Sequence, residues 1–290
     1  MFARAIWIPM AGLCALLWVA APPMRAGDDP KEIVRRALRN DARNRELEHR
    51  YTYVKRDDMR DLNGAGAVTH RDSKTWEVIP VGESRFRRLI EHDGRPPSAK
   101  EQREQEALQR KREAERRKTE DLRARETPEA RQKRLDAKER SRGRARRERD
   151  EALDGMDLRL VGEELIDGVP VWAIDGAPRP GYKFKFTAAG LLLAKTKGRI
   201  WVTKDGYQPV RLDVEILGTV SIGGVLARVN KGTHVHTEYT YVNGEVWLPK
   251  LSSFRVSARY LVFKGIHQEG DIAYSGYKKF TVDSRFVERE

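Results

Sequence analysis

The sequence has 290 residues, and its 57 lysines and arginines against 44 aspartates and glutamates give it a formal net charge of +13. Its single cysteine, Cys14, lies in the apolar N-terminal segment, so a mature chain without that segment has no disulfide, thiol nucleophile or cysteine-based metal site. Its stability must then come from a packed core, and its length suffices for one large domain or two small ones.

The N-terminus has the order of regions found in a secretory signal peptide. Arg4 gives a basic start, an apolar run extends from Ile6 to Ala21, and the small residue Ala26 precedes a polar segment. The apolar run is about 16 residues long, fewer than the roughly 20 that a membrane-spanning helix needs. We therefore expect cleavage after Ala26, with Ala20 as the alternative, and a mature protein in the periplasm.

Export changes how the basic charge is interpreted. A sequence pI of about 9.8 would indicate a nucleic-acid partner in a cytosolic chain. Nucleic acid is not a normal partner in the cell envelope, where an anionic lipid surface is the more plausible target of a basic protein. We expect no nucleic-acid partner, and an anionic membrane surface or an envelope protein instead.

The first part of the mature chain predicts a helix followed by strands. The segment from Asp29 to Arg50 has Pro30 at the first helical position and an apolar stripe at helical spacing. That stripe consists of Ile33, Val34, Ala37 and Leu38. From Tyr51 to Pro97, β-branched and aromatic residues predict three strands, at residues 51–54, 68–79 and 85–90, with turn residues 63–66 between the first two.

The segment from Ser98 to Glu151 has a different composition. Arg, Lys, Glu, Gln and Ala dominate it, and its few leucines are too sparse for a coiled-coil seam. It predicts a long solvated helix with many charge pairs, interrupted near Pro128. Two interpretations stay open for its basic end, a solvated projection or a docking surface for lipid headgroups or a protein. The candidate docking residues are Arg140, Arg142, Arg144, Arg146, Arg147 and Arg149.

From Met156 onward the chain again predicts strands joined by tight turns. The clearest alternation runs from Val210 to Ile216 and is typical of a half-buried strand. The other predicted strands cover residues 156–160, 169–174, 191–202, 233–242, 245–248, 253–263 and 272–282. Such a series predicts a meandering antiparallel sheet. Because β-rich blocks flank the charged segment, we expect a signal peptide at 1–26 and a single domain at 27–290, interrupted by an insertion at 98–151.

The sequence contains no motif typical of catalysis. A nucleophile elbow, a zinc-protease histidine pair and a phosphate-binding loop are all missing from it. His234 and His236 point to the same side of a predicted strand, and Glu238 follows them, which would suit a metal ion. Polar residues on a solvated face are the simpler interpretation, so we expect no metal, no cofactor and no enzymatic activity.

Three segments resemble a group of bacterial envelope proteins. They run from Trp76 to Pro97, from Ile200 to Leu212 and from Tyr241 to Lys250. This group is placed with the outer-membrane lipoprotein-sorting (LolA/LolB-like) superfamily, and the likeness extends over about 29–282 outside the charged insertion. The resemblance implies a mainly β fold with helices, in which a strongly curved antiparallel sheet forms an incomplete barrel with helices on its apolar concave side.

The resemblance also implies a function. It implies a periplasmic, non-enzymatic carrier that holds lipid or the acyl chains of lipoproteins on the concave side. Relatives of the RseB/MucB type instead sense lipid or misfolded protein, so the alternative is an envelope regulatory or scaffold protein that binds a partner through the charged insertion. The candidate residues of the apolar trough are Trp76, Trp172, Trp201, Val210, Leu212, Val214, Ile216 and Trp247. A packed core is the competing use of these residues.

Overall fold

The computed structural model describes residues 29–81, 84–185, 187–222, 227–260 and 264–280. The predicted signal peptide at 1–26 lies outside these residues. None of the described helices combines the length and the apolar character needed to cross a membrane.

Helix α1 (Pro30–Glu48) forms where the sequence predicts it. The Asp29 side chain accepts a hydrogen bond from the backbone N–H of Lys31 at 3.0 Å, and Pro30 occupies the first turn. The predicted stripe is the buried face, since Ile33 and Ala37 are both 0% exposed. Burial of this stripe, more than helix propensity, holds such a charged helix in place.

Twelve strands form one sheet, and all of the described strand pairs are antiparallel. The order is β3-β2-β1-β12-β11-β10-β7-β6-β5-β4, with the short strands β8 and β9 attached beside β11. The strands are β1 (Tyr51–Leu62), β2 (Val68–Val81), β3 (Ser84–His92), β4 (Met156–Ile166), β5 (Val169–Pro178), β6 (Thr196–Thr203), β7 (Pro209–Ile216), β8 (Val220–Ile222), β9 (Ala227–Val229), β10 (His234–Val242), β11 (Val246–Tyr260) and β12 (Lys264–Lys279). Strands β3 and β4 are the two edges, so the sheet is not closed. The predicted fold class, mainly β with helices, is confirmed.

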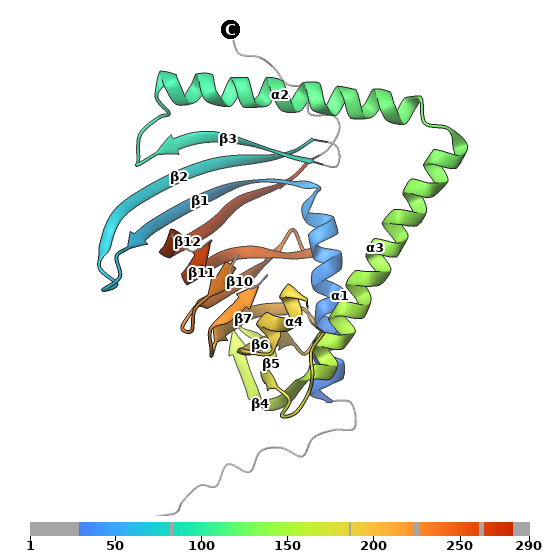
Figure 1. The fold of residues 1–290 in the computed structure, drawn as a ribbon, viewed down its shortest axis with the longest axis vertical. Coiled ribbons are helices and arrows are strands. Elements are labelled where there is room, and N and C mark those ends of the chain that lie inside the picture. The colour runs from blue at the N-terminus through green and yellow to red at the C-terminus, as the bar shows by residue number, and fades with distance from the viewer. Residues whose placement is uncertain (1–28, 82–83, 186, 223–226, 261–263, 281–290) are drawn as a thin grey trace, which may run out of the picture.

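The sheet bends around α1 (Figure 1). Near its N-terminal end, α1 packs Ile33 against Trp172 of β5 and Val202 of β6. Near its C-terminal end, Leu47 packs against a cluster that contains Tyr51 of β1 and Leu248 of β11. One helix therefore covers strands from both halves of the sheet, and we call the covered side the inner face.

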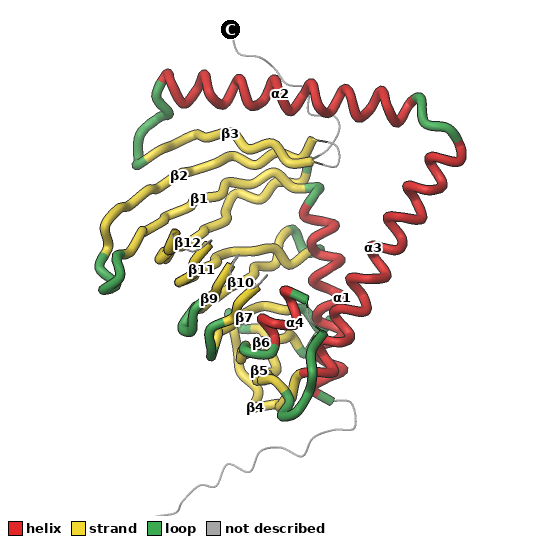
Figure 2. The backbone as a smooth tube through the Cα atoms, in the orientation of Figure 1, coloured by secondary structure: helices red, strands yellow, loops and turns green. Residues whose placement is uncertain are grey.

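The charged segment forms an arm of two helices, α2 (Ala99–Ala124) and α3 (Pro128–Gly155). The predicted interruption is confirmed, because the Thr127 side chain caps α3 by accepting a hydrogen bond from Ala130 N at 3.2 Å. No residue of α2 is buried, and α3 buries only Leu153 and Gly155. Since α2 follows β3 and α3 precedes β4, the arm links the two edges of the sheet and stands away from it between its ends (Figure 2).

One predicted strand is wrong over its first part. Residues 191–193, predicted as the start of a strand, belong to helix α4 (Ala188–Leu193), and β6 begins only at Thr196. The Thr187 side chain caps this helix by accepting a hydrogen bond from Gly190 N at 3.0 Å. A short apolar run is compatible with a buried helix as well as with a strand. Here the cap provided by Thr187 favours the helix.

Other elements differ from the predicted ones mainly in where they begin and end. Strand β1 runs on to Leu62, well past the predicted residue 54, and β12 begins at Lys264 rather than at residue 272. Strands β8 and β9 were not predicted, because three residues are too few for a periodic pattern. The predicted hairpin at β10 and β11 is confirmed, with Asn243 and Gly244 both at positive φ in its turn.

Replacing Ile33 by alanine should lower the free energy of unfolding by about 2–4 kcal/mol, because it opens a cavity under a fully buried side chain. Chemical denaturation monitored by circular dichroism measures this difference. The matched control is Arg43→Ala on the exposed side of α1, which should change stability by less than about 0.5 kcal/mol. Equal effects of the two variants would mean that the stripe does not hold α1 on the sheet.

Candidate functional site

A cavity of about 610 Å³ lies between the C-terminal half of α1 and the inner face of the sheet. From α1 it is lined by Asp41, Asn44, Arg45 and Glu48; from the sheet it is lined by Tyr53, Lys55, Val78, Arg85, Arg87, Thr237, Tyr239, Trp247, Leu248, Pro249, Ser252 and Tyr274. Its sheet residues come from β1, β2, β3, β10, β11 and β12. The sheet order places β12 between β1 and β11, so segments far apart in the sequence meet at this cavity.

Three tyrosines give the cavity an aromatic wall. The rings of Tyr53 and Tyr274 lie with their centroids 6.0 Å apart, tilted by 49°. Burial raises the pKa of Tyr53, Tyr239 and Tyr274 to about 12 each. All three phenols are therefore neutral near pH 7 and able to donate hydrogen bonds. The hydroxyls of Tyr239 and Tyr274 form no hydrogen bond with another described residue.

The carboxylates that line the cavity are already paired. Glu48 contacts Arg85, with Oε2 2.9 Å from Nη2, and Arg85 also donates to the Tyr53 hydroxyl at 3.4 Å. Asp41 contacts Arg45, one turn further along α1, at 2.6 Å. The two pairs satisfy the acidic groups of α1 and leave them little capacity to bind a cation.

Not every basic residue on the sheet side of the cavity has a carboxylate partner among the described residues. Lys55 pairs with Asp57 at 2.6 Å. Arg87 has no carboxylate partner among the described residues, and its guanidinium lies 5.8 Å from the ring centroid of Trp76. The buried Nε1 of Trp76 also has no hydrogen-bond acceptor among these residues. The cavity is thus amphipathic, with an aromatic wall and an excess of cations over carboxylates.

The structure divides the predicted trough residues between the two faces of the sheet. Trp172 is buried against α1 in the inner core. Leu212 lies opposite Ile200, which packs on that core, so Leu212, Val214 and Ile216 alternate onto the inner face. Trp76 lies opposite Lys55, which lines the cavity, and so is also on the inner face.

The other three trough residues pack together on the outer face. Trp201, Val210 and Trp247 belong to one cluster on the side away from α1. The indole of Trp201 donates to Glu164 at 2.9 Å, and Trp247 stacks on Tyr241 with centroids 5.3 Å apart. Although Trp247 packs with the outer cluster, it is also the one residue of the eight that borders the cavity, next to Leu248. Lipid binding by any of the eight stays a prediction.

The sequence did not point to the tyrosines and arginines that line the cavity. Tyr53, Tyr239 and Tyr274 lie on three strands whose pairing the sequence does not give. Alternation along β1, where Tyr51, Tyr53 and Lys55 share one face, was the available signal. It could show that these side chains lie on one side of the sheet but not that α1 covers them.

The six candidate docking arginines lie on α3 and divide between opposite sides of that helix. Arg142, Arg146 and Arg149 follow the helical spacing of the buried Leu153 and so face the body of the protein. The other three, Arg140, Arg144 and Arg147, share the opposite, outward face and are all exposed. Arg142 and Arg146 are exposed as well and Arg149 is half-buried, so basic residues are accessible on both sides of the helix.

The histidines considered for metal binding lie on the outer face in an ion-pair network. His236 contacts Asp213 through Nδ1 at 2.6 Å and Glu238 through Nε2 at 3.3 Å. His234 Nε2 lies 3.7 Å from the same Asp213 oxygen. His234 borders an open groove of about 530 Å³ in which charged residues pair with one another, as Arg199 does with Asp175 and Lys197 with Glu215.

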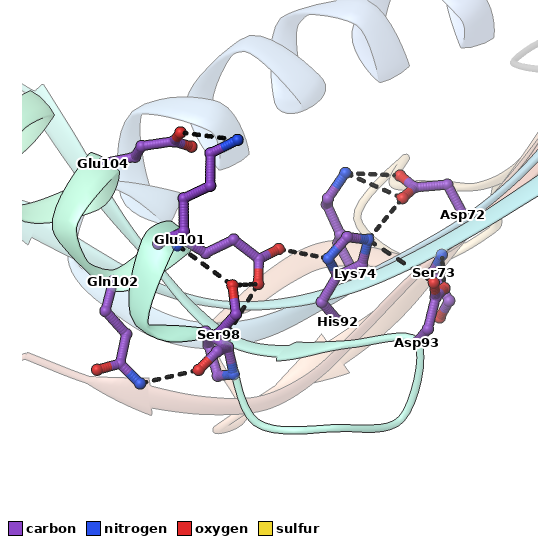
Figure 3. Close-up of polar contacts among 11 residues, drawn as sticks. Asp72, Ser73, Lys74, His92, Asp93, Ser98, Glu101, Gln102 and Glu104 are labelled. Carbon is purple, nitrogen blue, oxygen red and sulfur yellow. Dashed lines mark hydrogen bonds and ion pairs between the residues drawn. The ribbon is translucent and has the colours of Figure 1, made fainter.

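A third cluster surrounds His92 where α2 begins (Figure 3). His92 contacts Glu101 of α2 through Nδ1 and Asp72 of β2 through Nε2, the latter at 2.8 Å. Asp72, His92 and Asp93 offer ligand atoms within 4.8 Å of one another. However, the Lys74 ammonium binds both oxygens of Asp72, at 2.8 and 3.0 Å, so a cation already neutralises this carboxylate. We therefore interpret the cluster as an ion-pair network that fixes α2 to β2 and β3.

One serine–histidine pair is within hydrogen-bond distance. Ser257 Oγ lies 3.0 Å from His267 Nδ1 on the neighbouring strand. Asn230 donates to the same serine oxygen at 2.9 Å, and no described carboxylate contacts His267. An activated nucleophile needs a base that a third group orients, so this pair lacks one part of that arrangement.

No protein-family model matches the chain, and no curated protein matches its sequence. A search of solved structures finds three that can be compared with it. A DUF1329 family protein from Desulfovibrio piger is 12% identical, with 89% of this chain and 95% of that chain covered and a TM-score of 0.33. A putative outer membrane lipoprotein-sorting protein domain from Vibrio parahaemolyticus is 7% identical, with 87% and 95% covered and a TM-score of 0.31.

The third structure is a LolA superfamily protein from Nitrosomonas europaea, 9% identical, with 87% of this chain and 93% of that chain covered and a TM-score of 0.25.

The attachment of α2 should depend on pH through His92. Hydrogen bonds to Asp72 and then to Glu101 raise the pKa of His92, while burial and the Lys74 charge act in the opposite direction. Because the folded-state pKa is raised, the stabilisation is complete below the ordinary value of about 6.5 and is lost as the pH rises through the raised value. Amide-exchange protection of the first turns of α2, corrected for intrinsic rates, should therefore fall over that range.

The variant His92→Gln should show weaker protection at low pH and no such transition. Lys100→Gln is the matched control, since Lys100 is exposed on the same turn and lies 4.0 Å from Glu104. A titration of the His92 ring by NMR at or below the ordinary pKa would contradict the expectation.

Proposed function

We propose that this chain is a non-enzymatic binding protein of the periplasm, which carries lipid or the acyl chains of lipoproteins in the cavity beneath α1. The observation that carries the proposal is the cavity itself. Its volume of about 610 Å³ falls within the range of about 300–1,000 Å³ typical of small-molecule sites. The predicted signal peptide supports the location.

The chemistry of the cavity suits an amphiphile better than a purely apolar ligand. Tyrosine rings offer apolar surface to methylene groups, each worth about 0.8 kcal/mol when buried, and their hydroxyls can contact a polar head. Val78, Leu248 and Pro249 add apolar surface to the same walls. Because the sheet is not closed and one helix covers its inner face, ligand entry requires no opening of the sheet.

Blocking the cavity tests this proposal. In Ser252→Trp an indole replaces a hydroxymethyl group on the cavity wall, and it should reduce the lipid retained by the mature protein at least about tenfold, since one occupant excludes the other. Native mass spectrometry after detergent-free purification, with organic extraction of the bound material, measures the occupancy. The control Ala273→Trp places the same ring at an exposed position of β12 and should retain lipid normally.

Two results would contradict the carrier proposal. One is a wild-type protein that is free of lipid and ignores added lipid. The other is equal retention by the two tryptophan variants, which would place the lipid outside the cavity.

The arm supports a second candidate function, an envelope regulatory or scaffold protein that binds another protein. The observation in its favour is the cost of ordering more than fifty residues that bury almost nothing. The outward arginines Arg140, Arg144 and Arg147 would be the contact surface, and an acidic partner would match them.

Charge reversal on the two sides of α3 separates these functions. Replacing Arg140, Arg144 and Arg147 by glutamate should abolish cross-linking to an envelope partner and leave bound lipid unchanged, because none of these residues lines the cavity. The matched control reverses Arg142, Arg146 and Arg149, with the same change of net charge on the inward side. Equal loss from both variants would mean that total charge, and not the outward face, determines the contact.

A further inference from the structure

The polar groups that remain available in the cavity are almost all hydrogen-bond donors. The two described carboxylates of its lining, Asp41 and Glu48, are engaged by Arg45 and Arg85. The hydroxyls of Tyr239 and Tyr274 have no partner among the described residues. A ligand that satisfies this cavity must therefore bring acceptors.

The donors and cations gather on one part of the inner face. Strand pairing places Lys55 of β1 directly opposite Trp76 of β2 and Tyr274 of β12. Arg87 of β3 extends this group, since its guanidinium lies over the Trp76 ring. Residues opposite one another in a sheet have Cβ atoms about 5 Å apart, so the Arg87 guanidinium and the tyrosine hydroxyls can converge on one small head group, while Lys55 stays paired with Asp57.

One feature of this group indicates an anion. Arg87 lines the cavity and is a cation without a carboxylate partner among the described residues. A neutral head group would leave the Arg87 charge unmatched beside an aromatic wall, whereas an oxyanion would pair with it and accept from the tyrosines. Hydrogen bonds to ionised groups are about twice as strong as neutral ones.

We propose that the cavity selects amphiphiles whose head carries an oxyanion, a phosphate or a carboxylate, bound by Arg87 and the hydroxyls of Tyr239 and Tyr274. This inference rests on the proposed function, because it names the ligand class of the same cavity. The apolar chain lies against Val78, Leu248 and Pro249. The head, and not the chain length, then sets which envelope lipids bind.

Calorimetric titration of the mature, lipid-free protein compares three probes below their micellar concentrations: dodecyl phosphate, dodecyl maltoside and inorganic phosphate. Dodecyl phosphate should bind at least about tenfold more tightly than the maltoside, which has the same chain and a neutral head. Inorganic phosphate should bind more weakly still, because it lacks the apolar chain.

Variants locate the head group. Arg87→Gln should weaken dodecyl phosphate binding about tenfold, and Tyr274→Phe, which removes only a hydroxyl, about three- to fivefold. Neither change should affect the maltoside to the same degree. The matched control is Arg88→Gln, the next residue of β3, whose side chain is exposed and pairs with Glu77; it should leave all affinities within about twofold.

The outcomes separate the two proposals. Equal affinity for dodecyl phosphate and dodecyl maltoside, with unchanged binding in Arg87→Gln, would overturn the anion selectivity and leave the binding function intact. Failure of the wild-type protein to bind either amphiphile would overturn both. If inorganic phosphate bound as tightly as dodecyl phosphate, the apolar chain would add nothing to the affinity. The cavity would then be a site for a free anion and not for an amphiphile.

Discussion

The packing of α1 on the inner face of the sheet is the contact on which the rest of the structure depends. The helix is strongly charged, and its buried stripe, with Ile33 and Ala37 at 0% exposure, is what fixes it. An open antiparallel sheet with one apolar face needs such a cover, since that face would otherwise contact water. At its N-terminal end the helix completes a core with Trp172. At its C-terminal end polar residues replace the stripe, and there the cavity begins.

The arm also covers part of one edge of the sheet. An edge strand exposes unpaired backbone groups that favour aggregation. At one edge, the Gln105 side chain of α2 accepts a hydrogen bond from the backbone N–H of Leu89 in β3 at 2.9 Å. At the other edge, α3 ends against α1 and leads directly into β4, with Leu153 buried. The arm is thus fixed at its two ends and solvated between them, which explains how so charged a segment is ordered.

The sequence predicted elements well where a local pattern determines them. The α1 stripe, the interruption at Pro128 and the turn at Gly244 follow from periodicity, capping and φ preference, and all are confirmed. The candidate site was less predictable, because the cavity depends on which strands are neighbours. Tyr53 and Tyr274 meet through the pairing of β1 with β12, more than 200 residues apart. Apolar alternation could not distinguish Leu212 on the inner face from Trp201 on the outer one.

The same face of the sheet serves as core at one end and as cavity at the other, and side-chain chemistry sets the boundary. Beneath the N-terminal half of α1, Trp172 and Ile174 pack against the helix and are almost fully buried. Beneath its C-terminal half, Arg85 and Glu48 must keep their ion pair hydrated or hydrogen-bonded, because a fully buried pair would lose more hydration energy than it gains. Polar groups on both walls therefore prevent the helix from closing onto the sheet there. The shape of the cavity and its proposed ligand preference therefore have separate causes, because Arg85 and Glu48 keep the walls apart, whereas Arg87 and the hydroxyls of Tyr239 and Tyr274 would contact the head group.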